Sequence, residues 1–357
     1  MWRVVFFSFF LVFSGGIYAQ SKKKDKDTTR TLDPSADLYK AANKLVDSLQ
    51  YKDAIKTFQK AVKIKKEFAA AYNRMAFCYM QLKDFENAQK NLELSVKYQP
   101  DNFECVKLLG RACFLNKKYD EAKKHYAEAD SMEINNLELM LWMGELRAVG
   151  QDFKGAIDMY GAILNLNENY GQAYINRGVL KYKLKQYAYG AKDIEQGLKL
   201  VKFKNIDDEV YTDLAEAKFE LADFKGAIKA FDTLIRRNPK NEFALTYRGA
   251  SKIEVNDFSS AVSDLSEAIK LNGKSYIAYN FRGVAKGGLK QYVEALKDLD
   301  YAIKLKFDYA SVYVNRASIK MASKDRKGAC EDLQRADQLG SNVAYRLIQQ
   351  YCGGPDY

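Results

Sequence analysis

The stretch EFALTYRGASKIEVNDFSSAVSDLSEAIKLNGKS, residues 242–275, decides the fold because its pattern returns throughout the chain. An aromatic residue, Phe258, stands nine residues after the small Gly249, three before Ala261 and ten before Ala268. The same position is aromatic in seven other copies and is an arginine in a ninth. These nine residues are Tyr51, Phe85, Tyr119, Phe153, Tyr187, Phe224, Phe258, Tyr292 and Arg326, spaced by 34 residues except for one spacing of 37. A fixed period of this length predicts an array of repeats.

Two helices in each copy explain the pattern. Small side chains let two helices approach closely, and aromatic side chains fill the space between copies. The pattern resembles the tetratricopeptide repeat, a 34-residue helix-turn-helix unit with small residues at its eighth, twentieth and twenty-seventh positions. The resemblance implies an all-α fold, a right-handed α-solenoid of nine such repeats over residues 35–340. The family's proline near the end of the unit is present only as Pro100 and Pro239.

The repeat register also places the ends of the array. The units begin at Ser35, Ala69, Phe103, Leu137, Gly171, Asp208, Glu242, Tyr276 and Ala310. Three extra residues within 201–207 separate the fifth unit from the sixth. Residues 341–357 are predicted to form a capping helix and a C-terminal tail, because the last unit of an array has no neighbour to cover its apolar face.

The N-terminal end has the features of a secretory signal peptide. Arg3 precedes an apolar run from Val4 to Phe13, and the small Ala19 stands where cleavage is expected. The run is about half as long as the roughly 20 residues that a bilayer span needs. We therefore expect residues 1–19 to be removed and the protein to be exported, to the periplasm or cell envelope of a bacterium. Residues 20–34 form a polar, basic linker, for which contact with acidic lipid or polymer is the alternative.

Four repeats carry an arginine and an aspartate at matched positions, seven and twenty-three of the unit, and the two residues occur together. The pairs are Arg177 with Asp193, Arg248 with Asp264, Arg282 with Asp298 and Arg316 with Asp332. A lysine follows each arginine by four residues. This joint occurrence predicts ion pairs between the two helices of a repeat rather than a row of anion-binding sites. Such pairs specify geometry more than they add stability.

The resemblance implies that the first helices of the units line a concave groove in which a partner binds. Aromatic residues on this face either line the groove or pack against the neighbouring helix. Acidic residues at i, i+4, i+7 and i+11 form a stripe on the first helix of the sixth repeat. The residues predicted to bind a partner are Trp142, Tyr182, Glu209, Asp213, Glu216, Phe219, Glu220, Tyr247 and Phe281. We expect the stripe to receive a basic or amine-bearing segment of a protein, with a solvated face as the alternative.

Charge elsewhere on this face is mixed. Glu104, Glu138 and Glu145 add acid in the third and fourth repeats and are partly offset by Lys107 and Arg111. The whole chain has a formal net charge of +11, which by itself suggests nucleic acid as a partner. An exported chain with an acidic groove argues against nucleic acid.

The sequence has few of the residues that usually perform catalysis or bind metals and phosphates. The chain has one histidine, His125, and lacks a glycine-rich phosphate loop. No histidine-dependent nucleophile and no metal site is therefore supported, and we expect no catalytic residue and no cofactor. No run after the signal peptide is apolar for long enough to span a membrane, so no transmembrane segment is expected.

The five cysteines are an odd number, so at least one thiol does not pair within the chain. Cys330 lies in the second helix of the last repeat and Cys352 follows the capping helix, so a disulfide between them is possible and would hold the cap on the array. Cys78, Cys105 and Cys113 are predicted to be small core residues.

These features together predict a non-catalytic protein–protein interaction scaffold of the bacterial cell envelope that binds a partner peptide or helix in its groove. The alternative is a carbohydrate-binding solenoid that uses the groove aromatics for stacking. The carboxylate clamp of chaperone-binding family members is not expected, because only Asn43 matches its set of lysine, asparagine and arginine residues.

Overall fold

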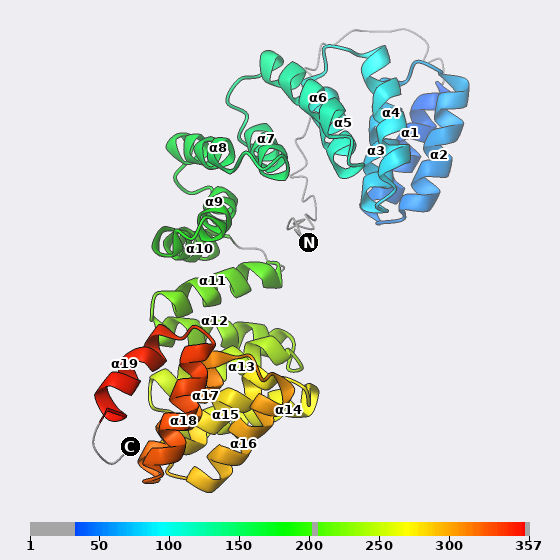
Figure 1. Cartoon of the computed structure of the whole chain (residues 1–357). Helices are drawn as coiled ribbons and strands as arrows, with labels where there is room; N and C mark the ends of the chain where they lie inside the picture. The colour runs from blue at the N-terminus through cyan, green and yellow to red at the C-terminus, as the bar shows by residue number, and fades with distance from the viewer. Residues whose placement is uncertain (1–32, 202–205, 354–357) are drawn as a thin grey trace. The chain divides into compact units, whose positions relative to one another are not determined.

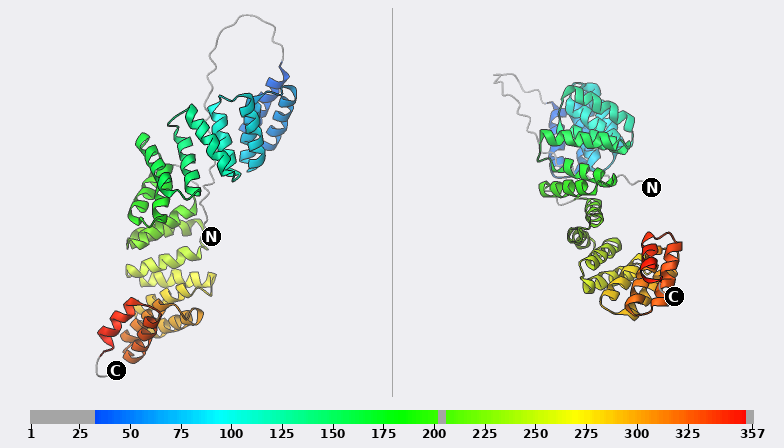
Figure 2. Two further views of the ribbon diagram at one scale, coloured as in Figure 1. Left: turned by 45° about the horizontal axis from the view of Figure 1, so that its top comes forward. Right: turned by 60° about the vertical axis from the view of Figure 1, so that its left-hand side comes forward.

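All regular secondary structure is helical in the computed structural model, which describes residues 33–201 and 206–353. Figures 1 and 2 show helices that follow one another in pairs along the chain. The predicted signal peptide, residues 1–19, lies outside the described residues, as do residues 20–32 of the predicted linker and residues 354–357 of the tail. No described helix is long and apolar enough to cross a membrane.

The chain divides into two compact units, of which the first ends at Ala173. The helices of the first unit are α1 (Pro34–Asp47), α2 (Tyr51–Ile64), α3 (Ala69–Gln81), α4 (Phe85–Tyr98), α5 (Phe103–Leu115), α6 (Tyr119–Met132), α7 (Leu137–Val149) and α8 (Phe153–Leu166). The boundary between the units falls inside α9 (Gly171–Lys183).

The second unit holds most of α9 and all later helices. These are α10 (Tyr187–Leu200), α11 (Asp208–Glu220), α12 (Phe224–Arg237), α13 (Glu242–Glu254), α14 (Phe258–Leu271), α15 (Tyr276–Gly288), α16 (Tyr292–Leu305), α17 (Ala310–Ala322), α18 (Arg326–Gln338) and α19 (Asn342–Tyr351).

The helix boundaries follow the predicted repeat register. The first helices of the second to ninth repeats begin at the predicted first residues of their units, from Ala69 in α3 to Ala310 in α17. Every second helix begins at the repeating aromatic residue or, in α18, at Arg326. Helix α1 begins at Pro34, one residue before the first repeat unit, because the Asp33 carboxylate accepts a hydrogen bond from the Ser35 backbone N–H and caps the helix. The predicted all-α repeat fold is confirmed.

Small residues let the two helices of a repeat approach each other. In the fifth repeat, both facing residues are glycines. A Cβ atom on Gly178 of α9 would lie 2.8 Å from the carbonyl oxygen of Gly190 in α10. Because backbone faces backbone there, no larger residue fits without moving a helix.

Each repeat uses the same turn between its two helices. In the first repeat, the Gln50 N–H donates to the Leu45 carbonyl and the Leu49 N–H donates to the Val46 carbonyl, both at 2.9 Å, a pattern that closes a helix end. This turn requires one residue of positive φ, which is not glycine in any of the nine repeats. The residues are Leu49, Lys83, Lys117, Gln151, Lys185, Ala222, Asn256, Lys290 and Lys324.

The four predicted ion pairs are present between the helices of their repeats. Each arginine donates two hydrogen bonds to the two carboxylate oxygens of its aspartate, at 2.5–2.9 Å. The lysine four residues later joins the same carboxylate at 2.7–2.9 Å. Burial raises the pKa of Asp193, but hydrogen bonds from Arg177 and Lys181 outweigh burial and leave that pKa below its ordinary value.

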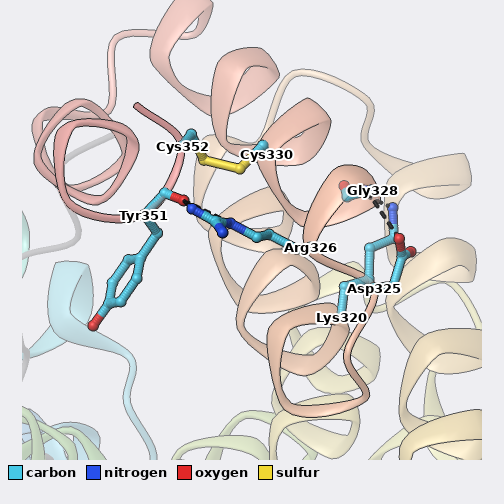
Figure 3. Close-up of a disulfide and its surroundings, with 7 residues drawn as sticks. All are labelled: Lys320, Asp325, Arg326, Gly328, Cys330, Tyr351 and Cys352. Atoms are coloured by element: carbon cyan, nitrogen blue, oxygen red, sulfur yellow. Dashed lines mark hydrogen bonds between the residues drawn. A yellow bond between two sulfur atoms is a disulfide. The ribbon is translucent and has the colours of Figure 1, made fainter. Parts of the chain in front are cut away.

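Helix α19 covers the end of the last repeat. Ala344 is fully buried there, and Leu347 and Ile348 pack against the same core cluster. A disulfide joins Cys330 of α18 to Cys352 after α19, with 5.9 Å between the Cα atoms. Figure 3 shows the Arg326 side chain beside this bridge, where it donates to the Tyr351 carbonyl oxygen at 2.8 and 3.0 Å. The other three cysteines are free and buried, which confirms them as core residues.

Candidate functional site

The side chains that could meet a partner lie on the first helices of the second unit. Tyr182 at the end of α9 donates a hydrogen bond from its hydroxyl to the Glu216 carboxylate on α11. Burial raises the pKa of Tyr182, and the hydrogen bond to Glu216 raises it further, so the hydroxyl stays protonated and acts as a donor. This bond joins the fifth repeat to the sixth across the segment that contains the three extra residues.

Asp213 occupies the middle of α11 and is only 6% exposed. Its Oδ2 atom is buried and has no hydrogen-bond partner among the described residues. Burial raises the pKa of Asp213 to about 8, Lys183 opposes that shift, and the negative charges of Glu209 and Glu216 add to it. A carboxyl group is thus buried without the cation or donors that normally accompany one.

Aromatic residues continue this face toward the C-terminus. The Phe219 ring of α11 lies perpendicular to the Tyr247 ring of α13, with 6.0 Å between their centroids. The Tyr247 ring in turn meets the Phe281 ring of α15 at 6.4 Å and 67°. The three rings are half-buried and pack edge to face, so they form a continuous aromatic row rather than separate flat platforms.

We define the α11 face as Tyr182, Asp213, Glu216, Phe219, Tyr247 and Phe281. Six of the nine residues predicted to bind a partner therefore lie on one face of the second unit. Glu209 interacts electrostatically with Asp213 one turn away, and Glu220 is exposed at the end of α11.

Trp142 differs from the prediction. It lies in the first unit, is only 4% exposed and belongs to that unit's hydrophobic core. The reason is that two cationic side chains cover its ring, with Lys107 at 5.7 Å and Arg111 at 5.1 Å from the centroid. Trp142 is thus a core residue and offers no ring face to a ligand.

Acidic charge on the first helices of the first unit is neutralised. Lys107 bonds Glu104 at 2.9 Å and Glu138 at 2.8 Å, and Arg111 bonds Glu145 at 2.5 Å. The sequence contained a signal for the last pair, because Arg111 and Glu145 hold the same position in successive repeats, 34 residues apart. Three acidic residues of α11 lack such compensation: Asp213, Glu216 and Glu220 form no ion pair with any residue of the described ranges.

Sequence reasoning missed one residue of this site and one property of another. Lys183 acts electrostatically on Asp213 from α9, although the two lie 30 residues apart in the chain. The burial of Asp213 was also not foreseen, since charged residues on a predicted stripe are normally solvated. Among the described residues, no group of three or more histidine, cysteine, aspartate or glutamate side chains could hold a metal ion.

Pairs of helices at a 34-residue period, closed by a capping helix, define an α-helical repeat protein. Two regions, residues 45–112 and 209–241, match models described as tetratricopeptide repeat. The chain therefore contains tetratricopeptide repeats in these two regions. Proteins of this repeat fold are typically non-catalytic scaffolds.

The curated relatives are distant. The chain is 26% identical over 204 residues to Protein O-mannosyl-transferase TMTC3 of Homo sapiens, covering 53% of this chain and 22% of that protein. It is 26% identical over 156 residues to Hsp70-Hsp90 organizing protein 3 of Arabidopsis thaliana, covering 43% of this chain and 26% of that protein. The chain thus spans about a quarter of the length of these relatives.

A solved structure of Pseudomonas aeruginosa pilF is similar in fold, with a TM-score of 0.50 and 15% sequence identity. The likeness covers 57% of this chain and 92% of that chain. At this identity it shows the fold alone.

Proposed function

We propose that the protein is a non-catalytic interaction scaffold of the bacterial cell envelope and that a segment of a partner protein binds on its α11 face. The observation that supports the proposal is that acidic side chains on this face form no ion pair among the described residues. Asp213 and Glu216 stand without an ion pair in the described chain, whereas Glu104, Glu138 and Glu145 of the first unit are paired. Acidic groups left without an ion pair, next to a row of aromatic side chains, suit recognition of another protein.

The packing of the rings favours a protein over a sugar. Stacking on a sugar needs a flat ring face open to the ligand, but Phe219, Tyr247 and Phe281 pack edge to face on one another. The carbohydrate-binding alternative therefore has less support than peptide or helix binding.

The names of the relatives give no reason to propose an enzymatic activity for this chain. The mannosyl-transferase is matched over only 22% of its length, so its named activity stays with that protein. The organizing protein of Arabidopsis is matched over 26% of its length, and its named association with Hsp70 and Hsp90 likewise stays with it.

Site-specific photo-crosslinking tests the binding face. A benzophenone amino acid replaces Phe281 on the α11 face in the full chain, expressed in bacterial cells, and the same residue replaces Tyr189 of α10 as a control. Tyr189 is an aromatic residue of the same unit that is 67% exposed. We expect discrete cross-linked products at position 281 and none at position 189. Equal labelling at the two positions, or none at 281, would refute the proposed face.

Export has a separate test, since it rests on residues 1–19 alone. We expect mass spectrometry of the protein recovered from the envelope to find an N-terminus at Gln20. An intact N-terminus in a cytoplasmic fraction would overturn the envelope location and leave the interaction proposal standing.

A further inference from the structure

We propose that Asp213 is the base of a binding site for one cationic side chain, a lysine or an arginine, of the partner segment. This inference rests on the proposed function and names the chemistry that the α11 face recognises. Three observations support it: how the chain satisfies its other buried aspartates, the unpaired oxygen of Asp213, and the charges around it.

Asp213 is the exception among the buried aspartates of the second unit. Five aspartates of this unit are less than 9% exposed in the described chain, namely Asp193, Asp213, Asp264, Asp298 and Asp332. The other four each receive two hydrogen bonds from an arginine and one ion pair from a lysine. From the part of the chain that the structure describes, Asp213 receives neither. In this protein, the other aspartates that are buried to this extent are thus paired with a guanidinium and an ammonium group.

The unpaired atom of Asp213 identifies where a cation would bind. Oδ2 is buried yet accepts no hydrogen bond from any described residue, and a buried acceptor left unpaired is costly. Lys183 is the positive group that acts on Asp213, but it forms no ion pair with it among the described contacts. No described residue therefore fills the position that an arginine or lysine fills beside the other four aspartates.

The groups around Asp213 are mainly acidic. From α11 come Glu209 and Glu216, and from its N-cap comes Asp207, all of which act on Asp213 as negative charges. Lys183 of α9 is the opposing charge. The Glu216 carboxylate is held by the Tyr182 hydroxyl, and Asp207 caps the helix through the Glu209 N–H. A cation entering here meets one buried carboxylate and a surplus of negative charge.

Binding of a cation is expected to depend on pH. Because burial raises the pKa of Asp213 to about 8, the free site holds a proton at neutral pH, and the bound cation displaces it. Affinity for a cation should then rise by about 90-fold between pH 6 and pH 9 if the carboxyl group is fully ionised in the complex.

The test uses small analogues of the two side chains. Binding of n-propylguanidinium and n-butylammonium to the full chain is measured by NMR titration, with n-butanol as the neutral probe and butyrate as the anionic probe. The variants are Asp213→Asn, which keeps the shape of the side chain, and Glu294→Gln as a control that makes the same carboxyl-to-amide change at an exposed position of α16. We expect Asp213→Asn to weaken cation binding by about 10- to 100-fold and Glu294→Gln to leave it unchanged.

The outcomes separate this inference from the proposed function. Equal cation binding by the unaltered chain and Asp213→Asn, or equal binding of butanol, overturns the cationic site even when cross-linking at position 281 persists. Loss of cation binding and of its pH dependence in Asp213→Asn alone supports the site. A failure of cross-linking at position 281 overturns the proposed face and is scored independently, because the small probes require no partner protein.

Discussion

The buried carboxyl group of Asp213 should make the stability of the second unit fall as pH rises. The folded chain holds the Asp213 proton up to about pH 8, whereas an unfolded aspartate releases it near its ordinary 3.8. Between these values the folded state binds one proton more than the unfolded state, so unfolding releases a proton and is favoured by higher pH. One such group lowers the free energy of unfolding by up to about 1.4 kcal/mol per pH unit. From pH 5 to pH 8 this amounts to about 3–4 kcal/mol at most.

The variant Asp213→Asn isolates this effect because asparagine does not titrate. Urea unfolding of both proteins at pH 5, 6, 7 and 8 gives a difference in which every other titrating group cancels. We expect the unaltered chain to lose stability relative to Asp213→Asn steadily across this range, and Glu294→Gln to run parallel to the unaltered chain. Because repeat arrays can unfold in parts, hydrogen exchange of the α11 amides supplies a local measure of the same difference.

Parallel stability profiles for the unaltered chain and Asp213→Asn would refute the reasoning. They would mean that Asp213 is ionised in the folded protein and has a counter-charge, in which case its Oδ2 is not available to a cation. A difference of opposite sign, with the unaltered chain gaining stability at high pH, would place a salt bridge at Asp213 and lead to the same conclusion.

Three further predictions concern the scaffold. Gly178→Ala should destabilise the second unit by about 1–3 kcal/mol in urea unfolding, because the new Cβ would lie 2.8 Å from a backbone oxygen. Gly273→Ala is the control: no atom lies nearer than 3.9 Å to its new Cβ, so it should be neutral or stabilising by up to about 1 kcal/mol. Cys352→Ser should cost about 3 kcal/mol, the value for a disulfide that closes 22 residues, and dithiothreitol should lower the melting temperature of the unaltered chain but not of the variant. Arg282→Met should lower the free energy of unfolding by about 3–5 kcal/mol, because it leaves Asp298 with a lysine alone. In a double-mutant cycle, the second change Asp298→Leu should restore most of that stability. Additive effects of the two changes would contradict a coupled pair.

Much of the fold could be predicted because it is set within each repeat. The starts of α3 to α18 follow from a period that small and aromatic residues mark at every copy. The Arg–Asp pairs could be predicted for the same reason, since both partners lie in one unit and change together. The turn residue of positive φ carried no such signal, because lysine, leucine, alanine, glutamine and asparagine occupy it in place of glycine.

The candidate site was less predictable because it depends on contacts between repeats. Trp142 lies on the face expected to bind a partner, but Lys107 and Arg111 of the preceding repeat cover its ring. Asp213 was correctly placed on an acidic stripe, yet its burial depends on side chains of neighbouring helices that the period does not align. A helical position fixes the direction of a side chain, whereas its exposure depends on the residues that face it.

The sixth repeat differs from its neighbours in a way that bears on Asp213. The fifth, seventh, eighth and ninth repeats hold their two helices with an arginine, an aspartate and a lysine, but the sixth has Leu214 and Ala230 at the positions of the arginine and aspartate. Both are buried, so two apolar residues stand where the other repeats have the ion pair. The sixth repeat therefore contributes no arginine from that position, while α11 still carries Asp213, Glu216 and neighbouring acids. The scaffold neutralises its buried aspartates in four repeats, but in the sixth repeat no described cation pairs with Asp213. The missing component of this site is positively charged, and a partner can supply it.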